Sequence, residues 1–211
     1  MLKVMAIGSL ALSMFVPLPD ATPPTVTPPG DKIVIELVTV NGSGCKEGTA
    51  KVAVNLDNTA FTVTYSDFLA QAGGGVNSIE SRKNCQLNLR VHVPNGFTYA
   101  ISQTDYRGYA FLAKGASAIQ RANYYFGGLS TTAYSVHNFK GPLDDDWQTT
   151  DIVDYPALSY LPCGEQRNLN INTELRASAG TSTPSVTNFI TMDSTDTSLS
   201  TTYHFAWKEC K

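Results

Sequence analysis

The sequence is poor in charged residues, and it shows almost no helical periodicity. Charged residues make up 16% of its 211 residues, the net charge is −3, and no basic patch stands out. Proteins that bind nucleic acid or anionic membranes carry basic surfaces, so we expect neither partner. Thr, Ser, Asn and Gly are abundant instead, a composition that favours strands joined by turns over helices.

Long hydrophobic stretches are also missing, apart from one at the N-terminus. Lys3 supplies a positive start, and the apolar stretch from Val4 to Val16 has the length of a signal-peptide core but is too short to span a bilayer. Residues 1–21 are therefore predicted to be a signal peptide, with a short membrane anchor as the alternative. A Pro/Thr-rich spacer over residues 22–31 and a single domain over residues 32–211 follow. The mature protein is predicted to be secreted and extracellular.

The chain has only four cysteines, Cys45, Cys85, Cys163 and Cys210. An even number in a secreted chain predicts two disulfides, for which three pairings are possible. We favour Cys45–Cys85 and Cys163–Cys210, which join neighbours along the chain. No two cysteines have the C-x2-C spacing of a zinc site, so we expect no metal and no cofactor. Paired cysteines also leave no thiolate for catalysis.

Alternation of apolar and polar residues is the pattern that the sequence does have. From Cys85 to Val93 every second residue is apolar or Cys, and the residues between are Gln, Asn, Arg or His. We count about nine or ten short strands separated by turn signals, with a bulge at Gly108. The helix candidates are single turns near Tyr65–Ala72 and Ala116–Arg121. The sequence therefore predicts an all-β fold, an antiparallel β-sandwich of jelly-roll-like or Greek-key type with two disulfides.

Polar and aromatic residues on the predicted strands are candidates for binding. Arg90 and His92 are two residues apart and so share one face of a strand, which is either a polar contact surface or an ordinary solvated face. Tyr124 and Tyr125 are adjacent and so face opposite ways, which leaves at least one free to contact a protein. The only glycosylation sequon begins at Asn41.

A run of acids over Gly141–Tyr155 contains Asp144, Asp145, Asp146 and Trp147. Successive acids after a Gly-Pro turn are typical of a solvated loop tip. The same run could bind a protein or hold calcium, although it lacks the glycine that an EF-hand loop needs after its acids. It could also imitate a glycosidase, which needs two carboxyl groups across a sugar-sized cleft, with the indole as a platform for the sugar.

Motifs for nucleophilic catalysis are missing. The sequence has no G-x-S-x-G elbow, and each of its three histidines lies within a predicted strand. We therefore expect a protein that is not an enzyme.

Six blocks of the sequence resemble a known family. They are "VTVNGSGCKEGTA", "SRKNCQLNLRVHVPNGFTYAI", "DYRGYAFLAKGA", "NYYFGG", "PCGEQRNLNINTELR" and the final "YHFAWKEC". In this order they are similar to DUF4360, a family of small secreted proteins from fungi and some bacteria whose function is unassigned. The resemblance implies secretion, an all-β domain and the four-cysteine framework, and it supplies no catalytic residues.

Three functions remain open. The first is a secreted, non-enzymatic binding protein that inserts the loops Lys114–Arg121, Gly127–Thr132 and Gly141–Tyr155 into an extracellular protein. A sharper version is a fungal effector that binds and inhibits a host hydrolase such as a protease. The second is a carbohydrate-binding or cell-wall-binding sandwich, with polysaccharide as the partner. The third is a glycan-active hydrolase that uses the loop aspartates.

Overall fold

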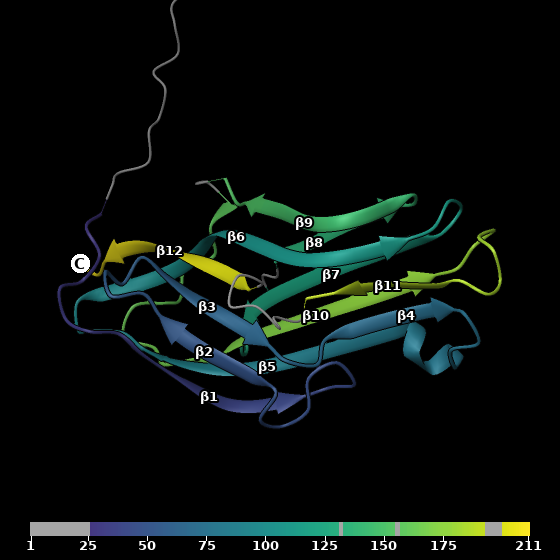
Figure 1. Cartoon of the computed structure of the whole chain (residues 1–211). Helices are drawn as coiled ribbons and strands as arrows, with labels where there is room; N and C mark the ends of the chain where they lie inside the picture. Colours follow the sequence, from purple (N-terminus) through teal and green to yellow (C-terminus); the bar gives the residue numbers. More distant parts are fainter. Residues whose placement is uncertain (1–25, 131–132, 155–156, 193–199) are drawn as a thin grey trace, which may run out of the picture.

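Two antiparallel sheets pack face to face in a computed structural model that describes residues 26–130, 133–154, 157–192 and 200–211 (Figure 1). The predicted all-β antiparallel sandwich with two disulfides is confirmed. The predicted signal peptide and residues 22–25 of the spacer lie outside the described residues. Within the described ranges, no helix has the length and apolar character needed to cross a membrane.

The five-stranded sheet has the order β1-β5-β10-β7-β8. Its strands are β1 (Val34–Asn41), β5 (Arg82–His92), β10 (Leu169–Ser178), β7 (Ser117–Phe126) and β8 (Ala133–Lys140). Only β7 and β8 follow one another along the chain, and they pair as a hairpin. The other neighbours are joined by long connections, as in Greek-key and jelly-roll sandwiches.

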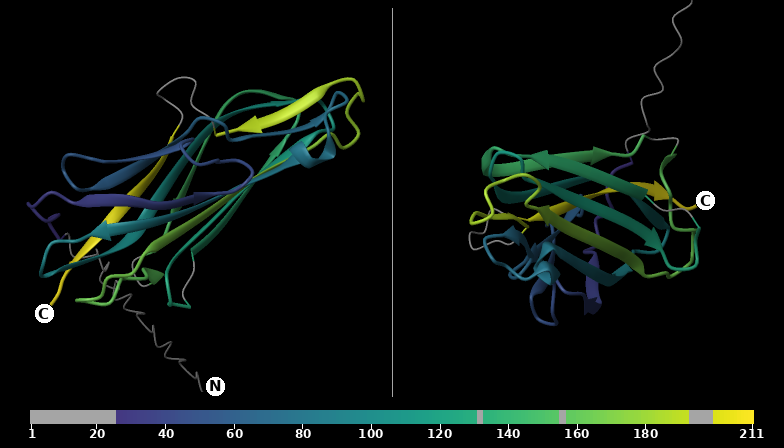
Figure 2. Two further views of the ribbon diagram at one scale, coloured as in Figure 1. Left: turned by 90° about the horizontal axis from the view of Figure 1, so that it is seen from below. Right: turned by 90° about the vertical axis from the view of Figure 1, so that its right-hand side faces the viewer.

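The seven-stranded sheet has the order β2-β3-β12-β6-β11-β4, and β9 pairs with β6. Its strands are β2 (Ala50–Val54), β3 (Ala60–Tyr65), β4 (Leu69–Gly73), β6 (Phe97–Leu112), β9 (Leu143–Ile152), β11 (Thr187–Thr191) and β12 (Thr201–Glu209). Strand β6 has 16 residues, so β12 pairs with its first half and β11 with its second (Figure 2). A short 3-10 helix, η1 (Ser78–Ser81), precedes β5.

Three segments that the sequence assigns to turns or loops are largely strand. Strand β4 occupies part of the helical turn predicted near Tyr65–Ala72, and β7 includes most of the turn predicted near Ala116–Arg121. Strand β9 takes up most of the loop predicted over Gly141–Tyr155. Both helix predictions are wrong because each segment gains hydrogen bonds by pairing with other strands, β7 with β10 and β8 and the edge strand β4 with β11, and these outweigh a weak local preference.

The predicted bulge at Gly108 is also wrong. Strands β6 and β9 pair without a register shift there, and the irregularity in β6 lies opposite the step from His204 to Phe205. Gly108 has a different role: a Cβ atom at this position would lie 2.5 Å from a ring carbon of Trp147 and 2.0 Å from the carbonyl oxygen of Thr191. The glycine therefore lets the Trp147 indole and β11 approach the backbone of β6.

The core between the sheets is aromatic and includes four fully buried tyrosines, Tyr65, Tyr99, Tyr106 and Tyr203. Phe61 stacks on Tyr203 with ring centroids 4.9 Å apart. Burial raises the pKa of all four phenols above the ordinary tyrosine value, because a phenolate loses its hydration in the core. The tyrosines therefore remain neutral while the sheets are packed together.

Two disulfides join the strands to the connections between them, in the pairing that we favour from the sequence. Cys45–Cys85 links the connection between β1 and β2 to β5, with Cα atoms 5.2 Å apart. Cys163–Cys210 links the segment before β10 to the chain after β12, with Cα atoms 5.7 Å apart. Each closes a loop of 40 or 47 residues, a length worth about 4 kcal/mol in the chain-entropy account of disulfides.

Candidate functional site

The outer face of the five-stranded sheet carries the polar pair that the sequence singles out. Arg90 and His92 lie on the same face of β5, and both contact Glu36 of β1. The distances to the carboxylate are 3.2 Å from Arg90 Nη1 and 3.0 Å from His92 Nε2. A half-exposed ion pair such as that of Arg90 with Glu36 contributes little to stability, so the cluster mainly sets the polarity of this end of the face.

Tyr124 and Tyr125 point to opposite sides of β7, as the sequence predicts. Tyr124 points inward, where its ring meets Tyr203 edge-on at 6.2 Å, and burial raises the pKa of its hydroxyl. Tyr125 lies opposite Asn170 and points outward, on the same face as Arg90. The structure thus brings Arg90, His92 and Tyr125 to one sheet face.

The acidic run Asp144–Asp146 is not a loop tip, because it forms part of β9. Its three carboxylates are exposed, and the Tyr109 hydroxyl donates a hydrogen bond to Asp144. Trp147 is only 6% exposed, with its ring 5.0 Å from Phe139, so it is not available as a surface platform for sugar. These four residues belong to the other sheet and do not join the outer face of the five-stranded sheet.

Amide side chains fill the middle of that outer face, which we call the amide face. They are Gln86 and Asn88 on β5, Asn170 and Asn172 on β10 with Asn168 just before it, and Asn123 on β7. Asparagine is depleted in strands because its side chain competes for backbone hydrogen bonds. Strand formation therefore does not explain why six amides gather at the centre of one sheet.

Three of these amides bond to one another and are fixed in place. Asn168 donates from Nδ2 to Asn88 Oδ1 at 2.6 Å, and Asn88 donates from Nδ2 to Asn170 Oδ1 at 2.8 Å. This short ladder orients the amide planes along β5 and β10. The two hydrogen bonds hold these three side chains in fixed orientations next to the remaining amides of the face.

A second set of residues crosses the sheet next to this ladder, and we call it the amide row. It consists of Asn41, Gln86, Asn172, Asn123 and Tyr134, which are successive register partners from β1 to β8. Within the part of the chain that the structure describes, the side chains of Gln86, Asn172 and Asn123 form no hydrogen bond to protein. Adjacent strands lie about 4.8 Å apart, so the row is about 19 Å long.

Two shallow hollows follow the amide row. One has a volume of about 430 Å³ and lies toward β1, where Thr39 and Asn41 line it. The other has a volume of about 270 Å³ and lies toward β8, where Tyr134 lines it. Gln86 and Asn172 line both hollows, so the two hollows adjoin along the row, and we call the pair the trough.

A carboxylate surrounded by arginines borders the trough. Glu174 of β10 contacts Arg82 at 2.5 Å, Arg176 at 2.6 Å and Arg121 at 3.8 Å. Burial raises the pKa of Glu174, but hydrogen bonds and charge from Arg176 and Arg82 outweigh it and hold the pKa below the usual value. Three arginines around one acid leave this border with a net positive charge.

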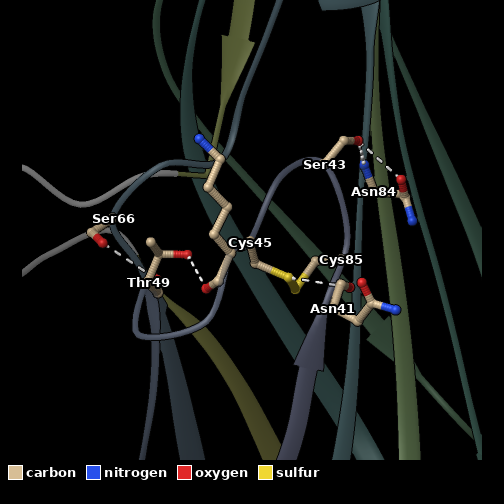
Figure 3. The surroundings of a disulfide bond; sticks show 8 residues. Asn41, Ser43, Cys45, Thr49, Ser66, Asn84 and Cys85 are labelled. Atoms are coloured by element: carbon tan, nitrogen blue, oxygen red, sulfur yellow. Dashed lines mark hydrogen bonds between the residues drawn. A yellow bond between two sulfur atoms is a disulfide. The ribbon is translucent and has the colours of Figure 1, made fainter.

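The β1 end of the amide row lies beside a disulfide (Figure 3). Asn41, the exposed sequon residue, ends β1 close to the Cys45–Cys85 bond. The sequon hydroxyl of Ser43 donates to Asn84 Oδ1 at 3.0 Å and accepts from the Asn84 backbone N–H at 3.2 Å. Glycosylation of Asn41 stays a prediction, and a glycan there would lie at the margin of the trough.

The described residues contain no group of three or more His, Cys, Asp or Glu that could hold a metal ion. Each histidine instead lies beside a single carboxylate: His92 by Glu36 at 3.0 Å, His137 by Asp151 at 3.0 Å and His204 by Asp105 at 2.7 Å.

Sequence reasoning missed the amide row as a unit. The signal was the period-two spacing of amides in "NCQLN" and "NLNIN", two segments far apart in the chain. Each segment alone predicts only a strand with one solvent-exposed polar face. The pairing of β5 with β10 is what places the two sets of amides side by side.

Comparison with known proteins identifies a family and a similar curated protein. The model of the family described as "Domain of unknown function (DUF4360)" matches residues 31–210. An "Uncharacterized secreted protein" of Arthroderma benhamiae is 38% identical over 183 residues, which are 87% of this chain and 74% of the relative.

Solved structures give distant likenesses. The structure of TmCBM61 in complex with β-1,4-galactotriose is 11% identical, with a TM-score of 0.30, and the match covers 83% of this chain and 91% of that one. The Cowpea mosaic virus top component is 9% identical, with a TM-score of 0.26 and a coverage of 89% and 94%. At such low TM-scores neither likeness bears on function.

Proposed function

This chain belongs to the DUF4360 family, whose function is unassigned. From the row of amide side chains without protein partners, we propose that it is a secreted, non-catalytic carbohydrate-binding protein. The amide row is the observation that carries the proposal. An extracellular location is supported by the predicted signal peptide, the two disulfides and the secreted relative.

The chemistry of the row suits the hydroxyl groups of a sugar chain. Each amide offers one acceptor oxygen and two donor hydrogens, and a sugar hydroxyl both donates and accepts. Gln86, Asn172 and Asn123 are free to form such bonds, since no protein group uses them within the described chain. The length of the trough, about 19 Å, suits a short stretch of a polysaccharide rather than a single sugar.

Aromatic side chains and rigidity support the same function. Tyr134, which is 66% exposed, lines the hollow toward β8, and the half-buried Tyr125 lines the hollow toward β1, so that each hollow has an aromatic ring that can contact the apolar face of a sugar. All the contact residues stand on paired strands and not on loops. Little conformational freedom is then lost on binding, which favours affinity.

Inhibition of a host hydrolase has less support in the described structure. Two of the three segments predicted to insert into a partner are largely strand, namely β7 and β9. The third, Gly127–Thr132, lies partly outside the described residues.

Binding to a panel of insoluble and soluble cell-wall polysaccharides tests the proposal. We expect the wild-type protein to bind at least one polysaccharide and the double variant Gln86→Ala/Asn172→Ala to bind about tenfold more weakly or worse, because two hydrogen-bonding groups are lost. Gln148→Ala, an exposed amide of β9 in the other sheet, is the matched control and should bind like wild type. Equal binding by the double variant, or no binding to any polysaccharide, would refute the function.

A further inference from the structure

Strand β8 of one sheet comes close to β9 of the other (Figure 1). A cleft lies beside this approach and is lined by residues of both strands. Its volume is about 470 Å³, which is the size of a small-molecule site. The floor is apolar and is formed by the buried side chains of Ile101, Phe126 and Leu169. The base of the cleft is therefore apolar and has room for a carbon skeleton.

The walls of the cleft combine aromatic rings with negative charge. Tyr124, Tyr125 and Tyr134 line it, together with Asp151 and Asp154 from β9 and the residues after it. No lysine or arginine is among the described residues that line it. Arg167, which contacts the Gly127 carbonyl next to the floor, is already paired with Glu165.

One carboxylate of the cleft, that of Asp151, has a close neighbour in His137 but no hydrogen bond from it among the described residues. Asp151 Oδ1 lies 3.0 Å from His137 Nε2. Asp151 Oδ2 is buried and has no hydrogen-bond partner among the described residues. No protein hydrogen bond compensates the charge at this oxygen, so a cation in the cleft would be attracted to the Asp151 carboxylate through space.

We propose that this cleft binds an organic ammonium ion. The carboxylates attract the charge, an aromatic ring beside a cation attracts it as well, and the apolar floor accepts its carbon substituents. A bare metal ion would gain nothing from the apolar floor, and an anion would be repelled by Asp151 and Asp154. The inference does not depend on glycan binding, although Tyr125 and Tyr134 lie between the cleft and the trough.

A titration followed by NMR with choline and with 3,3-dimethylbutan-1-ol tests the proposal. The two molecules have the same shape, and only choline is charged. We expect choline to bind with a dissociation constant of about 1 mM and to shift the resonances of the cleft strands, and the alcohol to bind at least about tenfold more weakly. Equal binding of the alcohol, or no binding of choline, overturns the proposal.

Variants then locate the effect. Asp151→Asn should weaken choline binding about tenfold, because it removes the nearest negative charge. Asp145→Asn makes the same charge change on the same strand but outside the cleft, and should leave binding unchanged. If both variants weaken binding equally, the attraction is general and the site is refuted. Should Asp151→Asn fail to fold, Tyr134→Ala changes a side chain that is 66% exposed, and unchanged choline binding by that variant would contradict the proposal.

Discussion

Asn58 lies in the turn between β2 and β3, is only 4% exposed and has a φ of 56°. Its Oδ1 accepts from the Ile33 backbone N–H at 3.2 Å, and its Nδ2 donates to the carbonyls of Pro29 and Asp31 at 2.8 and 2.9 Å. Its own carbonyl accepts from Trp207 Nε1 at 2.9 Å. One side chain thus ties the segment before β1 to the turn, and its backbone ties the turn to β12.

Asn58→Ala is expected to lower the free energy of unfolding by about 2–4 kcal/mol, because three hydrogen bonds are lost and alanine resists a positive φ. Asn58→Gly loses the same bonds without that backbone cost, and should be about 1 kcal/mol more stable than the alanine variant. Urea unfolding followed by tryptophan fluorescence measures both values. An alanine variant within about 0.5 kcal/mol of wild type would contradict the role given to Asn58.

At the scale of elements, β9 shows how charge protects a sheet edge. Within the described chain it pairs only with β6, so its other edge is open. Asp144, Asp145 and Asp146 lie along it and are exposed. Charged side chains on an edge strand hinder pairing with the edge of a second molecule, which gives the acidic run a physical reason that needs no catalysis.

Replacing Asp144, Asp145 and Asp146 by threonine should promote self-association without changing the fold, because a neutral strand-forming edge is left open. Size-exclusion chromatography with light scattering would detect the loss of monomer as concentration rises, while circular dichroism would show an unchanged strand content.

A control with the same change in net charge separates edge protection from general solubility. Replacing Asp31, Glu47 and Asp67, all exposed and none in a strand, by threonine should leave the protein monomeric. Equal association of the two triple variants would mean that overall charge, and not the edge, keeps the molecules apart.

Alternation of apolar and polar residues predicts strands well where one face of the strand is buried and the other is exposed to solvent. It succeeds for β5 and β10, whose buried residues are Cys, Leu, Val, Ile, Ala and a single Thr. It fails for β9, where three consecutive acids conceal the period and the strand exists only because β6 pairs with it. The amide row and the carboxylate beside each histidine depend on strand register, which no local pattern contains.

At the scale of the whole molecule, the two disulfides lie at opposite ends of β5. Cys85 is near its start, while Cys210 donates its backbone N–H to Gly96, in the turn after its end, at 2.8 Å. The first disulfide borders the trough at Asn41, and neither joins β8 to β9. The Cys45–Cys85 disulfide therefore stabilises the sheet beside the trough. Strands β8 and β9, which flank the cleft, are held together only by non-covalent contacts among the described residues, such as that of His137 with Asp151.

The buried tyrosines of the core have a consequence for alkaline solutions. A phenol whose pKa is raised by folding stabilises the protein fully below the pKa of the unfolded chain, about 10, and this contribution is lost as pH rises above that value. We expect the exposed phenols to ionise gradually and Tyr65, Tyr99, Tyr106 and Tyr203 to ionise together when the protein unfolds. A smooth single titration of all ten tyrosines would contradict this. Ultraviolet absorbance of phenolate thus reports directly whether the two halves of the sandwich are still in contact.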